Sequence, residues 1–345
     1  LRIAEELNAE SVMDLSIWGD LDYIRRTIID NSSIMVGTVP IYQVMVEHSD
    51  SMDAISIEDI LDVIDLQGSQ GVDFITIHCA LTREALPLLK NRTMGIVSRG
   101  GSFISHWMKT NDRENPLYEH FDDILDIARK YDITLSLGDG LRPGAIADAS
   151  DEAQFHELKI SGELVKRSRR AGVQVIVEGP GHVPLNQIKH NIRLQQDVCD
   201  NAPFYVLGPL VTDVAPGYDH IAGAIGGTLA AYYGASFLCY VTPSEHLRLP
   251  SIEDVREGII ASKIAAHSAD IAKSNDSALA WDEHFSKMRR RFDWEGMYSS
   301  AIDGRKPREY RKNSTHSDTE ECSMCGKYCA IKTSAVEENS GNIKK

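Results

Sequence analysis

The sequence predicts an α/β fold of the (β/α)8 TIM-type barrel class, followed by a helical region and a tail that contains three cysteines. Short apolar or β-branched runs recur through the first 250 residues, and each is followed by a polar or glycine-rich loop and a helical pattern. Beyond Pro250 only helical periodicity continues, and the cysteines lie near the end. A doubly wound open sheet is the alternative for the same alternation.

Eight segments have the length and composition of buried strands. They are Val12–Ser16, Met35–Tyr42, Phe74–Cys79, Gly95–Arg99, Thr134–Asp139, Gln174–Gly179, Phe204–Leu210 and Phe237–Pro243. Amphipathic segments lie between them, and two of these are Pro116 to Asp132 and Glu157 to Ala171. We therefore predict a barrel over residues 1–250 that carries a substrate site and a metal site.

The segment after the barrel divides into helices and a tail. Ser251 and Asp254 form the pattern of a capping box at the start of one helix, and a second helix is predicted from about Asp276 to Ile302. A charged linker from Asp303 to Glu320 precedes the cysteines, and such linkers are mobile. The predicted parts are thus a helical region, 251–303, and a linker with the tail, 304–345.

The composition limits the classes of function. A net charge of −15 and a pI near 5.2 argue against non-specific binding to nucleic acid. The uncharged stretch from Ile221 to Thr242 is divided by glycines into a helix and a strand, so we expect no membrane span. The sequence opens inside a helical pattern, Leu1 to Leu7, without a start signal, and we expect upstream residues to be missing. A reducing cytoplasm is the expected compartment.

Cys322, Cys325 and Cys329 have the spacing C-x2-C-x3-C. An odd number of cysteines without secretory features argues against a disulfide. Three thiolates suit a [4Fe–4S] cluster with one iron left free for another ligand, and the reversed spacing is that of radical S-adenosylmethionine enzymes. A Cys3His zinc site that includes His316 is the alternative. The remaining cysteines are expected in the core: Cys79, Cys199 and Cys239.

Polar residues follow several predicted strands, where a barrel keeps its chemistry. The hydroxyls, guanidinium and glycine amides of Ser98–Ser102 suit a phosphate. Asp139 and Arg142 bring opposite charges to one glycine-rich loop, and Glu178 ends the next strand.

His182 and His246 also follow predicted strands, and two histidines at the mouth of a barrel suit a shared metal ion.

Ten motifs occur in order along the chain: VMDLS, GTVPIYQ, ITIHC, GIVSRGGSF, NPLYEHFD, LSLGDGLRPG, VEGPGHVPL, FYVLGPLVTD-APGYDHI, LCYVTPSEHL and CSMCG--C. Over about Val12 to Lys332 the chain resembles the phosphomethylpyrimidine synthase family, a non-standard branch of the radical S-adenosylmethionine class. The resemblance implies a (β/α)8 barrel that binds 5-aminoimidazole ribotide. The implied substrate contacts are Met13, Tyr42, His78, Ser98, Arg99, Gly100, Asp139, Gly140, Leu141, Arg142, Glu178 and Tyr205.

The resemblance also implies cofactors and a reaction. His182 and His246 match a site for zinc or iron, and Cys322, Cys325 and Cys329 match the ligands of the [4Fe–4S] cluster. S-adenosylmethionine would give a 5′-deoxyadenosyl radical that converts the ribotide to 4-amino-5-hydroxymethyl-2-methylpyrimidine phosphate, with formate and carbon monoxide released.

We expect Asp139 and Glu178 to be the catalytic carboxylates, for proton transfer or hydroxyl orientation. The family forms homodimers in which the tail of one subunit covers the partner's barrel, so 251–303 is the expected dimerisation region. An electron donor such as ferredoxin or flavodoxin is expected.

The chain departs from the family pattern in several places. Ile17-Trp18 replaces a Thr-Gly pair, Ala80-Leu81 replaces Gly-Val, and the last two cysteines are one residue closer together. An upstream segment with a substrate-contacting asparagine is absent. A paralogue, 5-hydroxybenzimidazole synthase, uses the same ribotide to make the lower ligand of a cobamide and is the second hypothesis. A zinc-dependent barrel without radical chemistry is the third.

Overall fold

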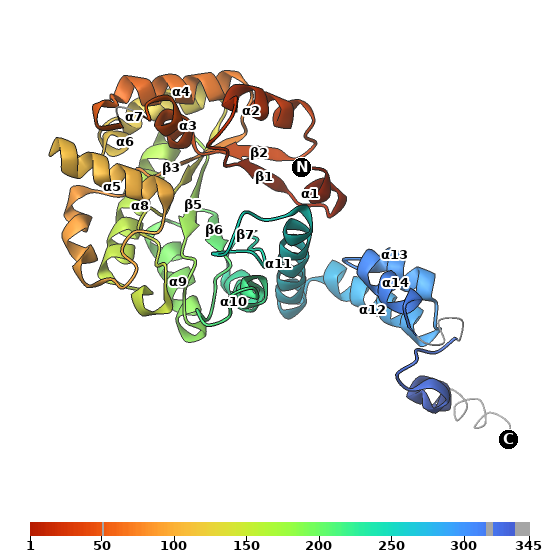
Figure 1. Ribbon diagram of the computed structural model, residues 1–345. Helices are drawn as coiled ribbons and strands as arrows, with labels where there is room; N and C mark the ends of the chain where they lie inside the picture. Colours follow the sequence, from red (N-terminus) through yellow and green to blue (C-terminus); the bar gives the residue numbers. More distant parts are fainter. Residues whose placement is uncertain (50–51, 315–319, 335–345) are drawn as a thin grey trace. The chain divides into compact units, whose positions relative to one another are not determined.

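The computed structural model describes residues 1–49, 52–314 and 320–334. The chain divides into two compact units, Leu1–Ala269 and Asp270–Lys345. The first unit is built on one curled parallel sheet, a half-barrel (Figure 1). Its strands are β1 (Ser11–Asp14), β2 (Met35–Thr38), β3 (Phe74–Ile77), β4 (Thr134–Leu137), β5 (Val175–Gly179), β6 (Phe204–Leu207) and β7 (Phe237–Cys239).

Each strand of the sheet pairs with the next one along the chain, so the spatial order is β1 to β7. This order has no reversal and therefore excludes the doubly wound alternative. Helices connect the strands, as parallel pairing requires. They are α1 (Arg2–Glu6), α2 (Leu21–Asp30), α3 (Pro40–Glu47), α4 (Ile57–Ser69), α5 (Arg99–Asn111), α6 (Pro116–Glu119), α7 (Phe121–Tyr131), α8 (Glu152–Arg170), α9 (Ile188–Val198), α10 (Asp219–Tyr233) and α11 (Ile252–Ala272).

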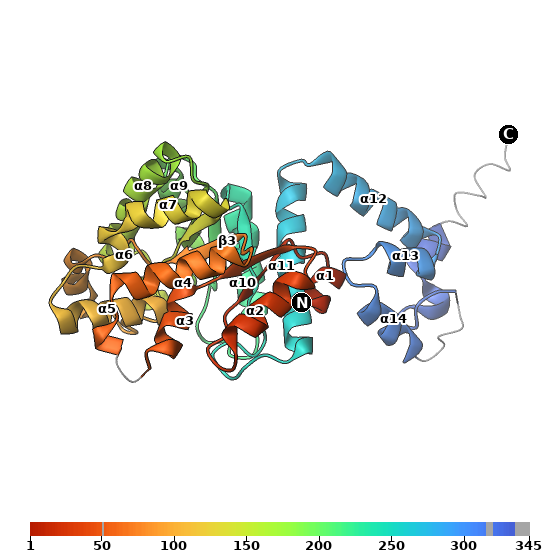
Figure 2. The ribbon, with the colours of Figure 1, turned by 90° about the horizontal axis from the view of Figure 1, so that it is seen from above.

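The helices cover the outer face of the sheet. Helices α3, α4 and α7 pack side by side, and α8, α9 and α10 form a second group (Figures 1 and 2). The predicted α/β class is confirmed, as are the helix and strand expected within the uncharged stretch, now α10 and β7. Among the described residues, no helix has the length and apolar character that a bilayer crossing requires.

The predicted strand Gly95–Arg99 is wrong, and a complete eight-stranded barrel is not confirmed. β3 pairs directly with β4, from Phe74 opposite Thr134 onward, so no sheet edge is left between them. Gly95 has a left-handed backbone, φ +65°, and the Ser98 hydroxyl accepts the Gly101 N–H at 3.1 Å, which starts α5.

The predicted strand Met35–Tyr42 is too long. Pro40 occupies the first turn of α3, so Tyr42 lies on a helix.

Glycines next to aromatic rings explain how neighbouring strands pack. A Cβ atom on Gly37 would lie 2.2 Å from the Phe74 ring, and one on Gly179 would lie 2.3 Å from the Phe204 ring. Phe204 is 2% exposed and belongs to the main hydrophobic core. The rings therefore occupy space that side chains at the two glycines would need.

The second unit contains α12 (Asp276–Arg290), α13 (Trp294–Ser300), α14 (Arg305–Lys312) and a 3-10 turn, Gly326–Tyr328. The predicted single helix to Ile302 is interrupted at Phe292, which has φ +57°. Part of the predicted linker is helical, since it contains α14. An ion pair between Arg308 and Glu295, at 2.6 Å, connects α14 to α13. His316 lies outside the described residues. The capping box of Ser251 and Asp254 is confirmed, with reciprocal bonds of 2.7 and 3.2 Å.

Replacing Phe204 with alanine removes a ring that is almost completely buried. We expect the free energy of unfolding to fall by about 3–5 kcal/mol, because the cavity left beside Gly179 cannot close fully. Urea denaturation would measure the change. Tyr23→Ala is the control, since that ring is 69% exposed and the substitution should change stability by less than about 0.5 kcal/mol. A similar small loss for both variants would contradict the packing argument.

Candidate active site

The carboxyl ends of the strands bring most of the predicted substrate residues together. Contacts join residues far apart in the sequence, because parallel strands end at one edge of the sheet. The Tyr205 hydroxyl on β6 lies 3.8 Å from the Met13 sulfur on β1. Thr76 on β3 donates a hydrogen bond to Glu178 Oε1 on β5 at 2.9 Å. These contacts join β1 to β6 and β3 to β5, and we call the region between them the pocket.

His78 lies at the base of this pocket and is 2% exposed. Its Nε2 is 3.1 Å from the Ser98 hydroxyl. That hydroxyl also accepts the Gly101 N–H, and its contact with Nε2 suits either tautomer of the neutral imidazole. Burial, together with the charge of Arg142, lowers the pKa of His78 to about 3. The imidazole is therefore neutral near pH 7.

Glycine backbones bring two loops of the pocket into direct contact. A Cβ atom on Gly100 would lie 2.3 Å from the His78 ring, and one on Gly101 would lie 2.4 Å from the Gly140 carbonyl oxygen. Only glycine lets the start of α5 approach both so closely. The guanidinium of Arg99 lies 4.8 Å from the ring centroid of Tyr42. This positive helix start suits an anionic group.

Asp139, Arg142 and Glu178 form a half-buried polar group. Arg142 Nη1 donates to Asp139 Oδ1 at 3.2 Å, and Asp139 Oδ2 has no hydrogen-bond partner within the described residues. Burial, with help from the charge of Glu178 and against that of Arg142, raises the pKa of Asp139 well above its usual value. A carboxyl group held near its protonated state can both give and accept a proton.

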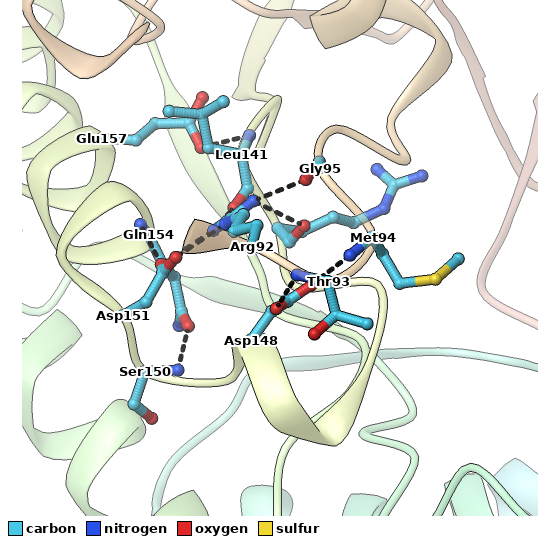
Figure 3. Close-up of polar contacts among 11 residues, drawn as sticks. Arg92, Thr93, Met94, Gly95, Leu141, Asp148, Ser150, Asp151, Gln154 and Glu157 are labelled. Carbon is cyan, nitrogen blue, oxygen red and sulfur yellow. Dashed lines mark hydrogen bonds and ion pairs between the residues drawn. The ribbon is translucent and has the colours of Figure 1, made fainter. Parts of the chain in front are cut away.

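The loop that carries Asp139 and Arg142 is held by buried side chains that the sequence did not reveal (Figure 3). Arg92 forms a double ion pair with Asp151, at 2.7 and 2.8 Å, and donates to the Leu141 carbonyl oxygen at 2.6 Å. Glu157 Oε2 accepts the Leu141 N–H at 2.8 Å. The only sequence signal for Glu157 is its place on the buried stripe of α8, which also includes Ala153, Gln154, Ser161 and Leu164.

His182 and His246 lie close together at the ends of β5 and β7. Their ring centroids are 5.3 Å apart. The Nδ1 atom of His182 is 2.8 Å from Asp213 Oδ1, and that of His246 is 3.4 Å from Asp219 Oδ1. Carboxylates at Nδ1 leave both Nε2 atoms available as ligands. In the described part of the chain no group of three His, Cys, Asp or Glu residues is arranged to hold a metal ion.

The three tail cysteines lie in the second unit and are free thiols. Their segment is compact: the Gly326 N–H donates to the Cys322 carbonyl at 3.1 Å, and the Cys329 N–H donates to the Gly326 carbonyl at 3.1 Å. Lys332 pairs with Glu320 at 2.9 Å, so the two ends of the segment meet. Of the cysteines predicted to fill the core, Cys79 and Cys199 are buried and Cys239 is half-buried.

The Radical SAM ThiC family model matches residues 1–336 of the chain. The chain belongs to this family. The predicted family is thereby confirmed.

Curated relatives agree with the family assignment. A phosphomethylpyrimidine synthase from Thermoanaerobacter sp. (strain X514) is 58% identical over 337 residues, which are 96% of this chain and 78% of the relative. Its counterpart from Caldanaerobacter subterraneus subsp. tengcongensis is 57% identical over 336 residues, with the same coverage of each chain. One from Clostridium tetani is 53% identical over 331 residues, 95% of this chain and 72% of the relative.

The neutral state of His78 predicts a pH dependence of stability. Its folded pKa, about 3, lies below the unfolded value of 6.5, so its contribution is complete above pH 6.5 and is lost as the pH falls toward 3. Between pH 7.5 and 5 this residue should cost about 2 kcal/mol of unfolding free energy. His78→Gln should therefore lose about 2 kcal/mol less than the wild type over this range in urea titrations at both pH values. Equal losses would show that His78 is not held neutral.

Proposed function

We propose that the chain is a phosphomethylpyrimidine synthase of thiamine biosynthesis, which converts 5-aminoimidazole ribotide to 4-amino-5-hydroxymethyl-2-methylpyrimidine phosphate with loss of formate and carbon monoxide. Family membership supports this reaction, and so do the names of the relatives. The observation that carries the proposal is the half-buried group of Asp139, Arg142 and Glu178, whose loop contacts the start of α5 where Gly140 meets Gly101. We also propose that the curled sheet derives from a (β/α)8-type barrel.

The donor set of the tail fits a [4Fe–4S] cluster. Cys322, Cys325 and Cys329 are free and lie on one compact segment, and they would hold three of the four irons. When bound, this cluster supplies the electron that cleaves S-adenosylmethionine to the 5′-deoxyadenosyl radical. The chain's own part is to present three thiolates and leave the fourth iron uncovered.

The residues of the pocket have complementary roles in this proposal. Ser98, Arg99 and Gly100 at the start of α5 bind the phosphate, aided by the backbone of Gly140 and Leu141. Neutral His78 presents an uncharged ring to the substrate, and its Nδ1 atom has no partner within the described residues.

Asp139 and Glu178 orient the ribose hydroxyls and transfer protons, and the guanidinium of Arg142 balances the negative charge of the two carboxylates. Met13, Tyr42 and Tyr205 form the remaining wall, which excludes water from the radical.

We propose that His182 and His246 hold a zinc or iron ion, because their Nδ1 atoms already face Asp213 and Asp219.

Asp213→Asn should weaken zinc binding by about 10–100-fold, since a carboxylate at Nδ1 makes the imidazole a stronger ligand. Competition with a fluorescent chelator would measure it. Asp112→Asn, at an exposed aspartate, is the control and should leave the affinity unchanged.

Other parts of the proposal concern assembly. We propose a homodimer formed through residues 251–303, in which the tail, 304–345, closes over the partner's sheet. The remaining partners are the small-molecule ribotide and an electron donor such as ferredoxin or flavodoxin. The cytoplasm is the proposed compartment, since the six cysteines are free.

The pyrimidine product is favoured over the benzimidazole product by the positions of the residues that depart from the family pattern. Trp18 is 87% exposed, so its ring extends into solvent instead of filling the pocket. Ala80 and Leu81 are completely buried in the core. Trp18 thus adds no bulk to the described pocket, whereas Leu81 lies beside Gly140 on the core side of its loop.

Product analysis tests the reaction. Anaerobically reduced enzyme given S-adenosylmethionine and the ribotide should form a phosphorylated pyrimidine, identified by mass spectrometry. A benzimidazole would assign the chain to 5-hydroxybenzimidazole synthase.

Metal analysis tests the class of chemistry. Anaerobically purified protein should contain about four iron and four sulfide per chain, and Cys325→Ser should lower both. Colourless protein with zinc and no sulfide would support the zinc-dependent alternative. Cys199→Ser, in the core of the first unit, is the matched control and should keep the iron.

A further inference from the structure

We propose that Arg92 and Glu157 are positioning residues that hold the Asp139–Arg142 loop from its buried side and so set the affinity for substrate. The identity of that substrate rests on the proposed function. Neither residue belongs to the predicted substrate contacts. Figure 3 shows both side chains converging on Leu141 from different elements.

Leu141 is the point at which the loop is held. Its side chain is completely buried, its N–H donates to Glu157 Oε2 at 2.8 Å, and its carbonyl accepts from Arg92 Nη2 at 2.6 Å. Arg92 Nη1 also reaches the Arg142 carbonyl at 3.4 Å. The backbone N–H and carbonyl of Leu141 are thus both hydrogen-bonded to buried side chains, those of Glu157 and Arg92. Asp139 and Arg142 lie within two residues of Leu141.

Arg92 also connects this loop to the segment that leads to the phosphate-binding residues. Its side chain is 1% exposed and is fixed by the double ion pair with Asp151. Its Nη1 donates to the Gly95 carbonyl at 3.2 Å. Asp148 accepts the N–H groups of Thr93 and Met94 at 2.7 and 2.8 Å. One guanidinium therefore fixes the spacing between the two loops that form the pocket.

Glu157 acts as a neutral acceptor in this arrangement. It lines a small cavity of ≈ 20 Å³ together with Asp139, Arg142 and Gln154. Burial raises its pKa to about 8, although the Leu141 N–H and the charges of Arg92 and Arg142 oppose the shift.

Asp139 and Cys79 are the other titratable groups that interact with it. The charge of Arg92 is balanced by Asp151, so Glu157 is not needed as its counter-ion. Glutamine at position 157 can therefore replace the neutral acid as a hydrogen-bond acceptor.

Small displacements of this loop should have large effects on binding. The side chains of Asp139 and Arg142 project from a backbone that also packs closely at Gly140 against Gly101. Misplacing a reacting group by about 1 Å can cost two orders of magnitude in rate. Loss of either anchor should therefore loosen the loop without removing any group that touches substrate.

The experiment compares Arg92→Met, Arg92→Lys, Glu157→Leu and Glu157→Gln in the complete, cluster-containing protein. Hydrogen exchange of the peptide that contains 139–142 reports the loop, and calorimetry with 5-aminoimidazole ribotide reports affinity. Arg92→Met and Glu157→Leu should exchange at least tenfold faster and bind at least tenfold more weakly. Arg92→Lys should be intermediate, and Glu157→Gln should be within twofold of the wild type.

Arg256→Met is the matched control. Arg256 is a buried arginine with a double ion pair to Glu6, at 3.0 and 2.9 Å, on α11. It should lower the melting temperature without changing loop exchange or affinity. Should Arg92→Met fail to fold, Arg92→Lys and Glu157→Leu decide the outcome.

Three results bear on the inference in different ways. Unchanged loop exchange and affinity in Glu157→Leu and the Arg92 variants would overturn the inference. If the wild type does not bind the ribotide, the proposed substrate is wrong, and faster loop exchange in the variants still establishes the anchoring role. If Arg256→Met weakens ribotide binding as much as the Arg92 variants do, the effect of Arg92 is one of general stability, and the inference is also overturned.

Discussion

The pocket depends on the burial of several charged groups at one edge of a parallel sheet. Asp139 and Glu178 interact with the guanidinium of Arg142, and Glu157 lies in the fields of both Arg92 and Arg142. Burial disfavours charge and raises the pKa of both Asp139 and Glu157. The proton that the carboxylates retain is then available to chemistry that must proceed without bulk water.

Much of the first unit could be predicted from sequence because its strands are short apolar runs that end in polar loops. Seven of the eight predicted segments overlap a strand. The exception, Gly95–Arg99, has the apolar pair Ile96-Val97 but is bounded by a left-handed glycine and a helix cap. Local composition does not reveal that β3 and β4 leave no room between them. The direct pairing of β3 with β4 therefore excludes residues 95–99 from the sheet.

Some residues of the site could be predicted from their local sequence, and others are apparent only from contacts between distant parts of the chain. His182 and His246 could be predicted to meet, because both follow strands of one parallel sheet. Arg92 could not be identified, since it lies in a polar stretch and its partner Asp151 is 59 residues away. Glu157 resembles an ordinary helix residue until α8 is packed against the loop. The proposed substrate contacts lie in recognisable motifs, whereas the residues proposed to position them can be identified only in the folded structure.

The contact between Gly101 and Gly140 has an evolutionary consequence. No side chain separates the two loops, and a single added methyl group at Gly101 would meet the Gly140 carbonyl oxygen at 2.4 Å. Neither loop can therefore shift its backbone alone. An evolutionary change at this contact requires paired substitutions, one in each loop, whereas the exposed Ile17 and Trp18 are under no such limit.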